Sequence, residues 1–138
     1  MLELLAPAGN LDAVIAAVQN GADAVYMGFG DGFNARRSAD NFTRESFAKA
    51  VRYCHIRGCK VYVTLNTLVG DREMEAAAAL AQQASDAGAD AILVQDLGLA
   101  RVLRDALPDI PLHASTQMSI HNLAGVEAAA EMGITRAV

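Results

Sequence analysis

Patterns of buried strands and amphipathic helices alternate along the whole chain, and short turns join them. Two segments show the repeated unit clearly: residues 20–26 (NGADAVY) and 87–93 (AGADAIL) each end a helix at a glycine and then begin an apolar strand. Repeated strand–helix units with short turns predict parallel strands that are joined by right-handed crossovers. The sequence therefore predicts an α/β fold.

Apolar runs and turn residues place the expected elements. Strands are expected at residues 2–5, 24–27, 60–65, 91–94, 112–114 and 135–138. Helices are expected between them, because apolar residues recur there at helical spacing and glycines follow. The helix caps expected from residue type and position are Asn10, Thr43, Asp71 and Asn122.

Two architectures fit this order of elements, a doubly wound sheet and a (β/α) barrel. In the strand at 60–65, Tyr62 and Thr64 share one face with Asn66, whereas the odd-numbered residues 61–65 are all apolar. A barrel would place the first set, together with Glu3, in its lumen and the second set against its helices. A doubly wound sheet is more often apolar on both faces, so this alternation favours the barrel.

The length of the chain bears on the size of that barrel. A doubly wound sheet would be complete at 138 residues, whereas a full (β/α)8 barrel needs roughly 200 or more. The sequence stops inside an apparent strand, which favours truncation. Residues 1–138 are therefore expected to form a partial TIM-type barrel domain, the N-terminal portion of about five to six βα units.

Composition bears on partners and location. The formal net charge is −5, and Arg36–Arg37 is the one Lys/Arg doublet, so this segment alone gives no support for nucleic-acid binding. No apolar run approaches the roughly 18 residues of a membrane span. The two cysteines, Cys54 and Cys59, are expected to be reduced packing residues without a metal. A cytoplasmic location is expected.

Polar residues gather where the predicted strands end, which is where ligands bind in parallel α/β folds. The candidate pocket residues, none of them assigned a catalytic role, are Asn34, Arg36, Asn66, Gln95, Asp96, Ser115, Thr116 and Gln117. The Arg36 guanidinium is suited to holding a carboxylate. Plainer interpretations stay open: Arg36 as a solvated loop residue, Asn66 as a turn residue and Asp96 as a helix cap.

Motifs at these strand ends resemble the collagenase-like peptidase family, unassigned peptidase family thirty-two. The resemblance keeps its order and spacing over nearly the whole chain. It rests on ELLAPAGN (3–10), GADAVYMG (21–28), FNAR (33–36), NF (41–42), KVYVTLNTL (60–68), DLG (96–98) and LHASTQMSIHN (112–122).

The resemblance implies a barrel-type catalytic domain of a bacterial protein. Members are described as peptidases or collagenases, or are tied to oxygen-independent hydroxylation of a transfer RNA uridine, a ribosomal RNA cytidine or a quinone precursor. For the full-length protein it implies prephenate as the hydroxyl source and a four-iron four-sulfur cluster. The family's cluster cysteines lie beyond the matching region, so no cofactor is expected within this segment.

Three functions remain open for this segment. The favoured one is the N-terminal part of a hydroxylase that acts on RNA or a quinone precursor and uses a small carboxylate, because no H-E-x-x-H, G-x-S-x-G or triad is visible. The second is a peptidase, as the family name states. The third is a non-catalytic half-barrel that self-associates through its open sheet edge. The fragment alone is expected to be inactive.

Overall fold

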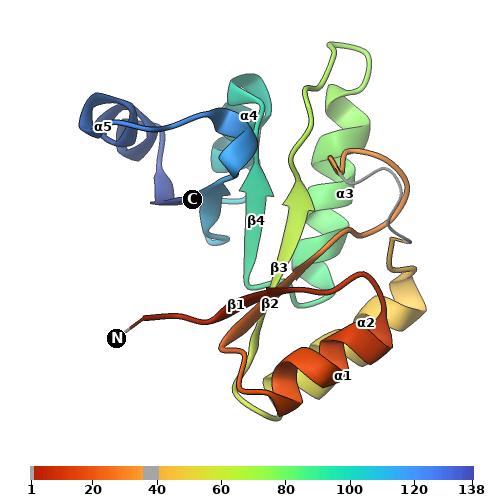
Figure 1. The fold of residues 1–138 in the computed structure, drawn as a ribbon. Helices are drawn as coiled ribbons and strands as arrows, with labels where there is room; N and C mark the ends of the chain where they lie inside the picture. The colour runs from red at the N-terminus through yellow and green to blue at the C-terminus, as the bar shows by residue number, and fades with distance from the viewer. Residues whose placement is uncertain (1, 36–40) are drawn as a thin grey trace.

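Six parallel strands follow one another in sequence order within a single sheet of the computed structural model, which describes residues 2–35 and 41–138 (Figure 1). A doubly wound sheet reverses its strand order at a switch point, and this sheet does not. The curved arrangement is that of a (β/α) barrel, with β1 and β6 at its two edges. The strands are β1 (Leu5–Pro7), β2 (Ala24–Met27), β3 (Lys60–Leu65), β4 (Ala91–Val94), β5 (Leu112–Ala114) and β6 (Ile134–Ala137).

The helices follow one another around the outside of the curved sheet (Figure 1). They are α1 (Leu11–Gln19), α2 (Arg44–His55), α3 (Met74–Asp86), α4 (Leu97–Ala106) and α5 (Leu123–Glu131), with a 3₁₀ turn at Thr116–Met118. In the part of the chain that the structure describes, no helix is both long and apolar enough to cross a membrane.

Side-chain caps fix the first turn of most of these helices. The expected caps Asn10, Thr43 and Asn122 each accept a hydrogen bond from a backbone N–H three residues further on, and Asp96 caps α4 in the same way. The expectation for Asp71 is wrong. It lies in a turn and α3 begins at Met74, while the Glu73 carboxylate accepts from the Gly70 N–H at 2.9 Å and so caps that turn.

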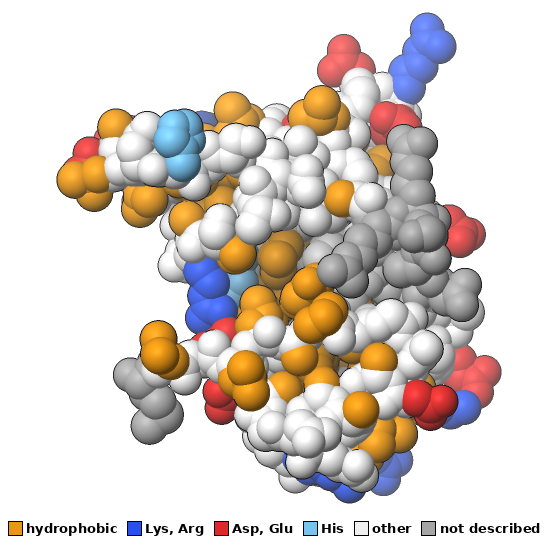
Figure 2. Space-filling view, in the orientation of Figure 1, with side chains coloured by type: hydrophobic (Ala, Val, Ile, Leu, Met, Phe, Trp, Pro, Cys, Tyr) orange, Lys and Arg blue, Asp and Glu red, His pale blue; other side chains and the backbone are white. Residues whose placement is uncertain are grey.

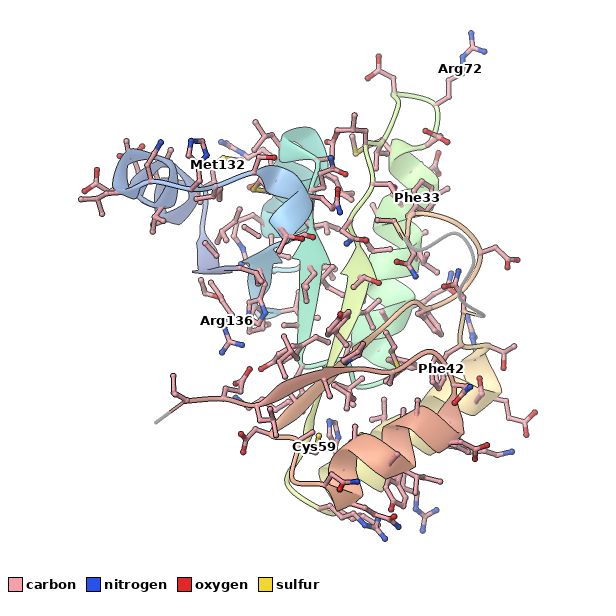
Figure 3. The ribbon with its side chains drawn as sticks, in the orientation of Figure 1. Phe33, Phe42, Cys59, Arg72, Met132 and Arg136 are labelled. Carbon is pink, nitrogen blue, oxygen red and sulfur yellow. The ribbon has the colours of Figure 1, made fainter. Side chains whose placement is uncertain are left out.

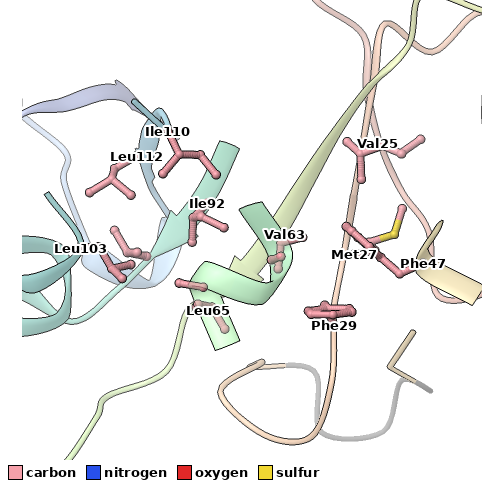
Figure 4. Close-up of a cluster of buried hydrophobic side chains, with 14 of the residues drawn as sticks. Val25, Met27, Phe29, Phe47, Val63, Leu65, Ile92, Leu103, Ile110 and Leu112 are labelled. Carbon is pink, nitrogen blue, oxygen red and sulfur yellow. The ribbon is translucent and has the colours of Figure 1, made fainter. Parts of the chain in front are cut away.

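The outward face of the sheet forms the main core. Every second strand residue points to the helices, so Val25, Val63, Ile92 and Leu112 pack with helix residues such as Leu103 (Figure 4). All five are fully buried. The face of β3 that the sequence predicted to meet the helices therefore does so.

The inward face of the sheet carries a polar cluster across the lumen. The Tyr62 hydroxyl lies 3.1 Å from both oxygens of the Glu3 carboxylate, and Arg136 on β6 forms a bidentate ion pair with the same carboxylate. Figure 3 shows Arg136 extending from β6. This pairing holds the pKa of Glu3 below its ordinary value. The predicted lumenal position of Glu3 and Tyr62 is confirmed, and their contact with Arg136 links the two edge strands.

His113 of β5 lies beside this cluster and has little access to water. Its ring meets the Tyr62 ring edge-on, with centroids 4.9 Å apart, and only 6% of the residue is exposed. Burial, aided by the positive charge of Arg136, lowers the pKa of His113 from 6.5 to about 4. His113 is therefore neutral at pH 7.

This burial predicts a pH-dependent stability. The unfolded chain protonates His113 near pH 6.5, whereas the folded chain protonates it only near pH 4. Between these values the unfolded state binds more protons, so acidification should lower the free energy of unfolding, by about 3 kcal/mol in all. Urea denaturation at pH 7.0 and 4.5 measures the loss. It should shrink in His113→Phe and persist in His121→Gln, a change at an exposed histidine; equal losses in wild type and His113→Phe would contradict the assignment.

Candidate functional site

The carboxyl ends of the strands surround a cavity of about 280 Å³, which we call the C-terminal cavity. Figure 2 views the molecule from the inner side of the curved sheet and shows a hollow near the middle, where apolar side chains gather. The lining combines hydroxyl and amide side chains with apolar ones. It consists of Leu5, Pro7, Ala8, Gly9, Tyr26, Met27, Gly28, Asn34, Ala35, Thr64, Asn66, Leu93, Ser115, Thr116, Gln117 and Val138.

Asn66 joins three of these strand ends. Its Oδ1 accepts a hydrogen bond from the backbone N–H of Ala35 at 3.1 Å, and its Nδ2 donates to the Ser115 hydroxyl, also at 3.1 Å. Ala35 follows β2, Asn66 follows β3 and Ser115 follows β5. One amide side chain thus fixes the relative positions of three loops around the cavity.

Gly28 allows a second amide contact at the rim. Asn34 Nδ2 donates to Asn41 Oδ1 at 3.1 Å, and both side chains lie over the Gly28 backbone. A Cβ at position 28 would stand 2.1 Å from Asn41 Oδ1 and 2.4 Å from Asn34 Nδ2. The Phe42 N–H also donates to the Gly28 carbonyl at 3.0 Å, which folds the loop back onto the end of β2.

The structure brings five of the eight predicted pocket residues to the cavity: Asn34, Asn66, Ser115, Thr116 and Gln117. Asp96 instead caps α4, accepting from the Leu99 N–H at 2.8 Å, and also from the Val69 N–H at 3.4 Å. Gln95 is half-buried outside the lining formed by the described residues. Arg36 lies outside the described residues. That these side chains bind a ligand stays a prediction.

The sequence predicted a lumenal position for Thr64 without naming it as a pocket residue, and it did not indicate Tyr26 or Leu93 at all. Tyr26, Thr64 and Leu93 reach the floor of the cavity from the middle of β2, β3 and β4. The Thr64 hydroxyl donates to the Met27 carbonyl at 3.2 Å and is 4% exposed. The alternation along each strand was the available signal, because residues two positions before a strand-end residue share its face.

The described lining residues carry no charged side chain, so what the described part of the cavity offers is hydrogen-bonding groups and apolar surface. Within residues 2–35 and 41–138, no three His, Cys, Asp or Glu side chains are grouped to hold a metal ion.

The two cysteines do not fit an iron–sulfur cluster, which usually needs four thiolate ligands. Cys54 lies in the last turn of α2 and Cys59 directly precedes β3. Figure 3 shows Cys59 at the opposite end of the sheet from Phe33. Both are buried, and burial raises the pKa of Cys54 to about 12. Both are thiols at neutral pH, and no step of a reaction is assigned to a cluster in this chain.

Comparison with known proteins agrees with this architecture. A model described as peptidase family U32 matches residues 9–138. The chain belongs to peptidase family U32. It is 41% identical over 137 residues to a 5-hydroxycytidine synthase for 23S ribosomal RNA of Escherichia coli. It is 38% identical over 136 residues to a tRNA hydroxylation protein of Bacillus subtilis, and 35% identical over 121 residues to a collagenase of Porphyromonas gingivalis.

These relatives are much longer than the region that they share with this U32 chain. The match covers 99% of the chain in the first two cases and 87% in the third. It covers 20%, 32% and 28% of the respective relatives. The chain therefore spans about a fifth to a third of their length.

Solved structures support the fold. A U32 peptidase superposes with a TM-score of 0.80 at 16% identity, over 99% of this chain and 57% of that one. The HMG-CoA lyase of Bacillus subtilis gives a TM-score of 0.67 at 19% identity, over 96% of this chain and 51% of that one. At these identities the likeness concerns the fold alone.

The close packing over Gly28 gives a testable prediction. Gly28→Ala should push Asn34 and Asn41 apart, break their hydrogen bond and lower the free energy of unfolding by about 1 to 3 kcal/mol. Gly9→Ala is the matched control in the same lining, because an added Cβ there meets no described heavy atom within 4 Å. Urea denaturation of both variants measures the difference, and equal stabilities would contradict the packing described here.

Proposed function

We propose that the full-length protein hydroxylates a pyrimidine base of RNA and that the C-terminal cavity binds this base. The observation that carries the proposal is the position of the cavity, at the strand ends of a U32 barrel segment, together with its amide and hydroxyl lining. Two relatives at 41% and 38% identity are named for ribosomal RNA hydroxycytidine synthesis and tRNA hydroxylation.

The lining suits an unstacked base. Single bases are recognised by stacking on aromatic or apolar side chains and by hydrogen bonds to their polar edges. Tyr26 and Leu93 supply apolar surface at the floor, while Asn66, Ser115 and Gln117 supply hydrogen-bonding groups at the rim. The target would have to lie in a single-stranded segment or be turned out of its helix to enter the cavity.

The proposal includes prephenate as the hydroxyl donor, without molecular oxygen, in a cytoplasmic bacterial protein. Prephenate carries carboxylates, and the described lining is uncharged. Arg36 would supply the charge, since it belongs to the FNAR segment that also contains the lining residues Asn34 and Ala35. An iron–sulfur cluster would be held by cysteines outside this chain.

Peptide hydrolysis is the second candidate, because a collagenase of Porphyromonas gingivalis is 35% identical over 121 residues. The local geometry gives it little support. The Ser115 hydroxyl accepts hydrogen bonds from the Asn66 amide and from the Gln117 N–H. The neighbouring His113 packs on Tyr62. In the described part of the chain, no serine–histidine hydrogen bond of the kind that activates a nucleophile is present.

Mass spectrometry of RNA tests the proposed function. Ribosomal and transfer RNA from a strain lacking the full-length gene should contain less of one hydroxylated pyrimidine, and the plasmid-borne gene should restore it. Restoration should also occur under anaerobic growth. Unchanged RNA modification in the deletion strain, together with cleavage of a collagen peptide by the purified protein, would replace this proposal with the peptidase.

Arg36 gives a second prediction. In the full-length protein, Arg36→Ala should raise the KM for the carboxylate donor by about tenfold or more, because a charged hydrogen-bonding partner is lost. The thermal unfolding midpoint should move little. Arg37→Ala is the matched control for charge and should keep the wild-type KM. A wild-type KM in Arg36→Ala would contradict the carboxylate clamp.

A further inference from the structure

The Ser115 hydroxyl has both of its accepting positions occupied. Asn66 Nδ2 donates to its oxygen at 3.1 Å, and the backbone N–H of Gln117 donates to it at 3.3 Å. The orientation of the Asn66 amide is fixed, because its other end accepts from the Ala35 N–H and must therefore be the oxygen. Neither nitrogen can accept a hydrogen bond, so the hydroxyl hydrogen points to neither of them.

This hydrogen has no acceptor among the described residues, although Ser115 is only 3% exposed. A hydroxyl group carries one donor and two accepting lone pairs, and a buried donor without a partner destabilises the fold. Ser115 lines the C-terminal cavity. The cavity is therefore the direction in which this hydrogen finds an acceptor.

We infer that Ser115 donates its hydroxyl hydrogen to the 2-carbonyl oxygen of the pyrimidine bound in the C-terminal cavity. The inference rests on the proposed function and names the group that is recognised. Cytosine and uracil share this carbonyl, whereas they differ at carbon 4. Carbon 5 lies across the ring from it, so a donor at the 2-carbonyl leaves the position named in 5-hydroxycytidine free.

Thr64 complements Ser115 on the same side of the sheet. Its hydroxyl hydrogen is committed to the Met27 carbonyl at 3.2 Å, so its oxygen can only accept from a ligand. The lining thus offers a donor at Ser115 and an acceptor at Thr64. A pyrimidine base, which carries carbonyl and N–H or amino groups on one edge, satisfies both.

Nucleosides that differ in one atom test this hydrogen bond. The full-length protein is titrated by calorimetry with cytidine and uridine and with their 2-thio analogues, in which a weakly accepting sulfur replaces the carbonyl oxygen. Wild type should bind the oxygen nucleosides about three- to tenfold more tightly, the ratio that one neutral hydrogen bond supplies. Ser115→Ala should lose most of this preference, and Ser115→Thr should keep it.

A second variant removes the donor without removing the hydroxyl. In Asn66→Asp, one carboxylate oxygen still accepts from the Ala35 N–H. The other carboxylate oxygen accepts the Ser115 hydroxyl hydrogen, which is then no longer available to a ligand. The oxygen-over-sulfur preference should therefore fall as in Ser115→Ala. Adding Asn66→Asp to Ser115→Ala should cause little further change, because the two changes act on the same hydrogen. Ser85→Ala on α3, outside the cavity lining, is the matched control.

The outcomes separate this inference from the proposed function. No binding of either nucleoside, or an unchanged oxygen-over-sulfur preference in Ser115→Ala and Asn66→Asp, would overturn the role of Ser115 even if RNA hydroxylation is observed. Absence of RNA hydroxylation would refute the proposed function alone, since the binding preference is measured without turnover. If Ser115→Ala fails to fold, Asn66→Asp decides the question.

Discussion

The alternation of side chains along the strands is the constraint on which the rest of the structure depends. Residues on one face of β3 pack against helices, while Tyr62 and Thr64 face the lumen and the cavity. A shift of pairing by one residue would exchange the two faces and place apolar residues in the lumen. The register that buries the core therefore also carries the polar residues to the cavity.

Asn66 forms hydrogen bonds between residues that this register brings to the cavity. Its partners Ala35 and Ser115 stand 31 and 49 residues away in the sequence. Ala35 follows the neighbouring strand β2, whereas Ser115 follows β5, so the second hydrogen bond reaches past β4. The amide holds the loops that follow β2 and β5 with both of its ends. In doing so it fills one accepting position of the Ser115 hydroxyl and helps to direct the hydroxyl hydrogen into the cavity. The same hydrogen bonds thus hold the loops in place and orient the Ser115 hydroxyl toward the proposed ligand.

Much of the fold could be predicted from the sequence, because local rules dominate it. Helix caps such as Asn10 and Thr43, and the alternation at 60–65, each act within a few residues. Asp71 failed as a cap because the neighbouring Glu73 takes part in a turn that the local pattern does not reveal. Asp96 left two interpretations open, and the structure shows the cap.

The site was less predictable because its contacts are long-range. Asn66 and Ser115 were identified as strand-end polar residues, but nothing local shows that they bind each other. Thr64 was predicted to face the lumen but not to line the pocket, and Tyr26 and Leu93 were missed, because pocket residues were expected after the strands rather than within them. Gln95 shows the opposite error, since it follows β4 and yet stands outside the described cavity lining.

A crystal structure of the full-length protein with bound cytidine or uridine would test the central claim most directly. The base should lie in the C-terminal cavity, with its 2-carbonyl oxygen within hydrogen-bonding distance of the Ser115 hydroxyl. A base bound elsewhere on the barrel, with Ser115 directed toward another protein group, would contradict it.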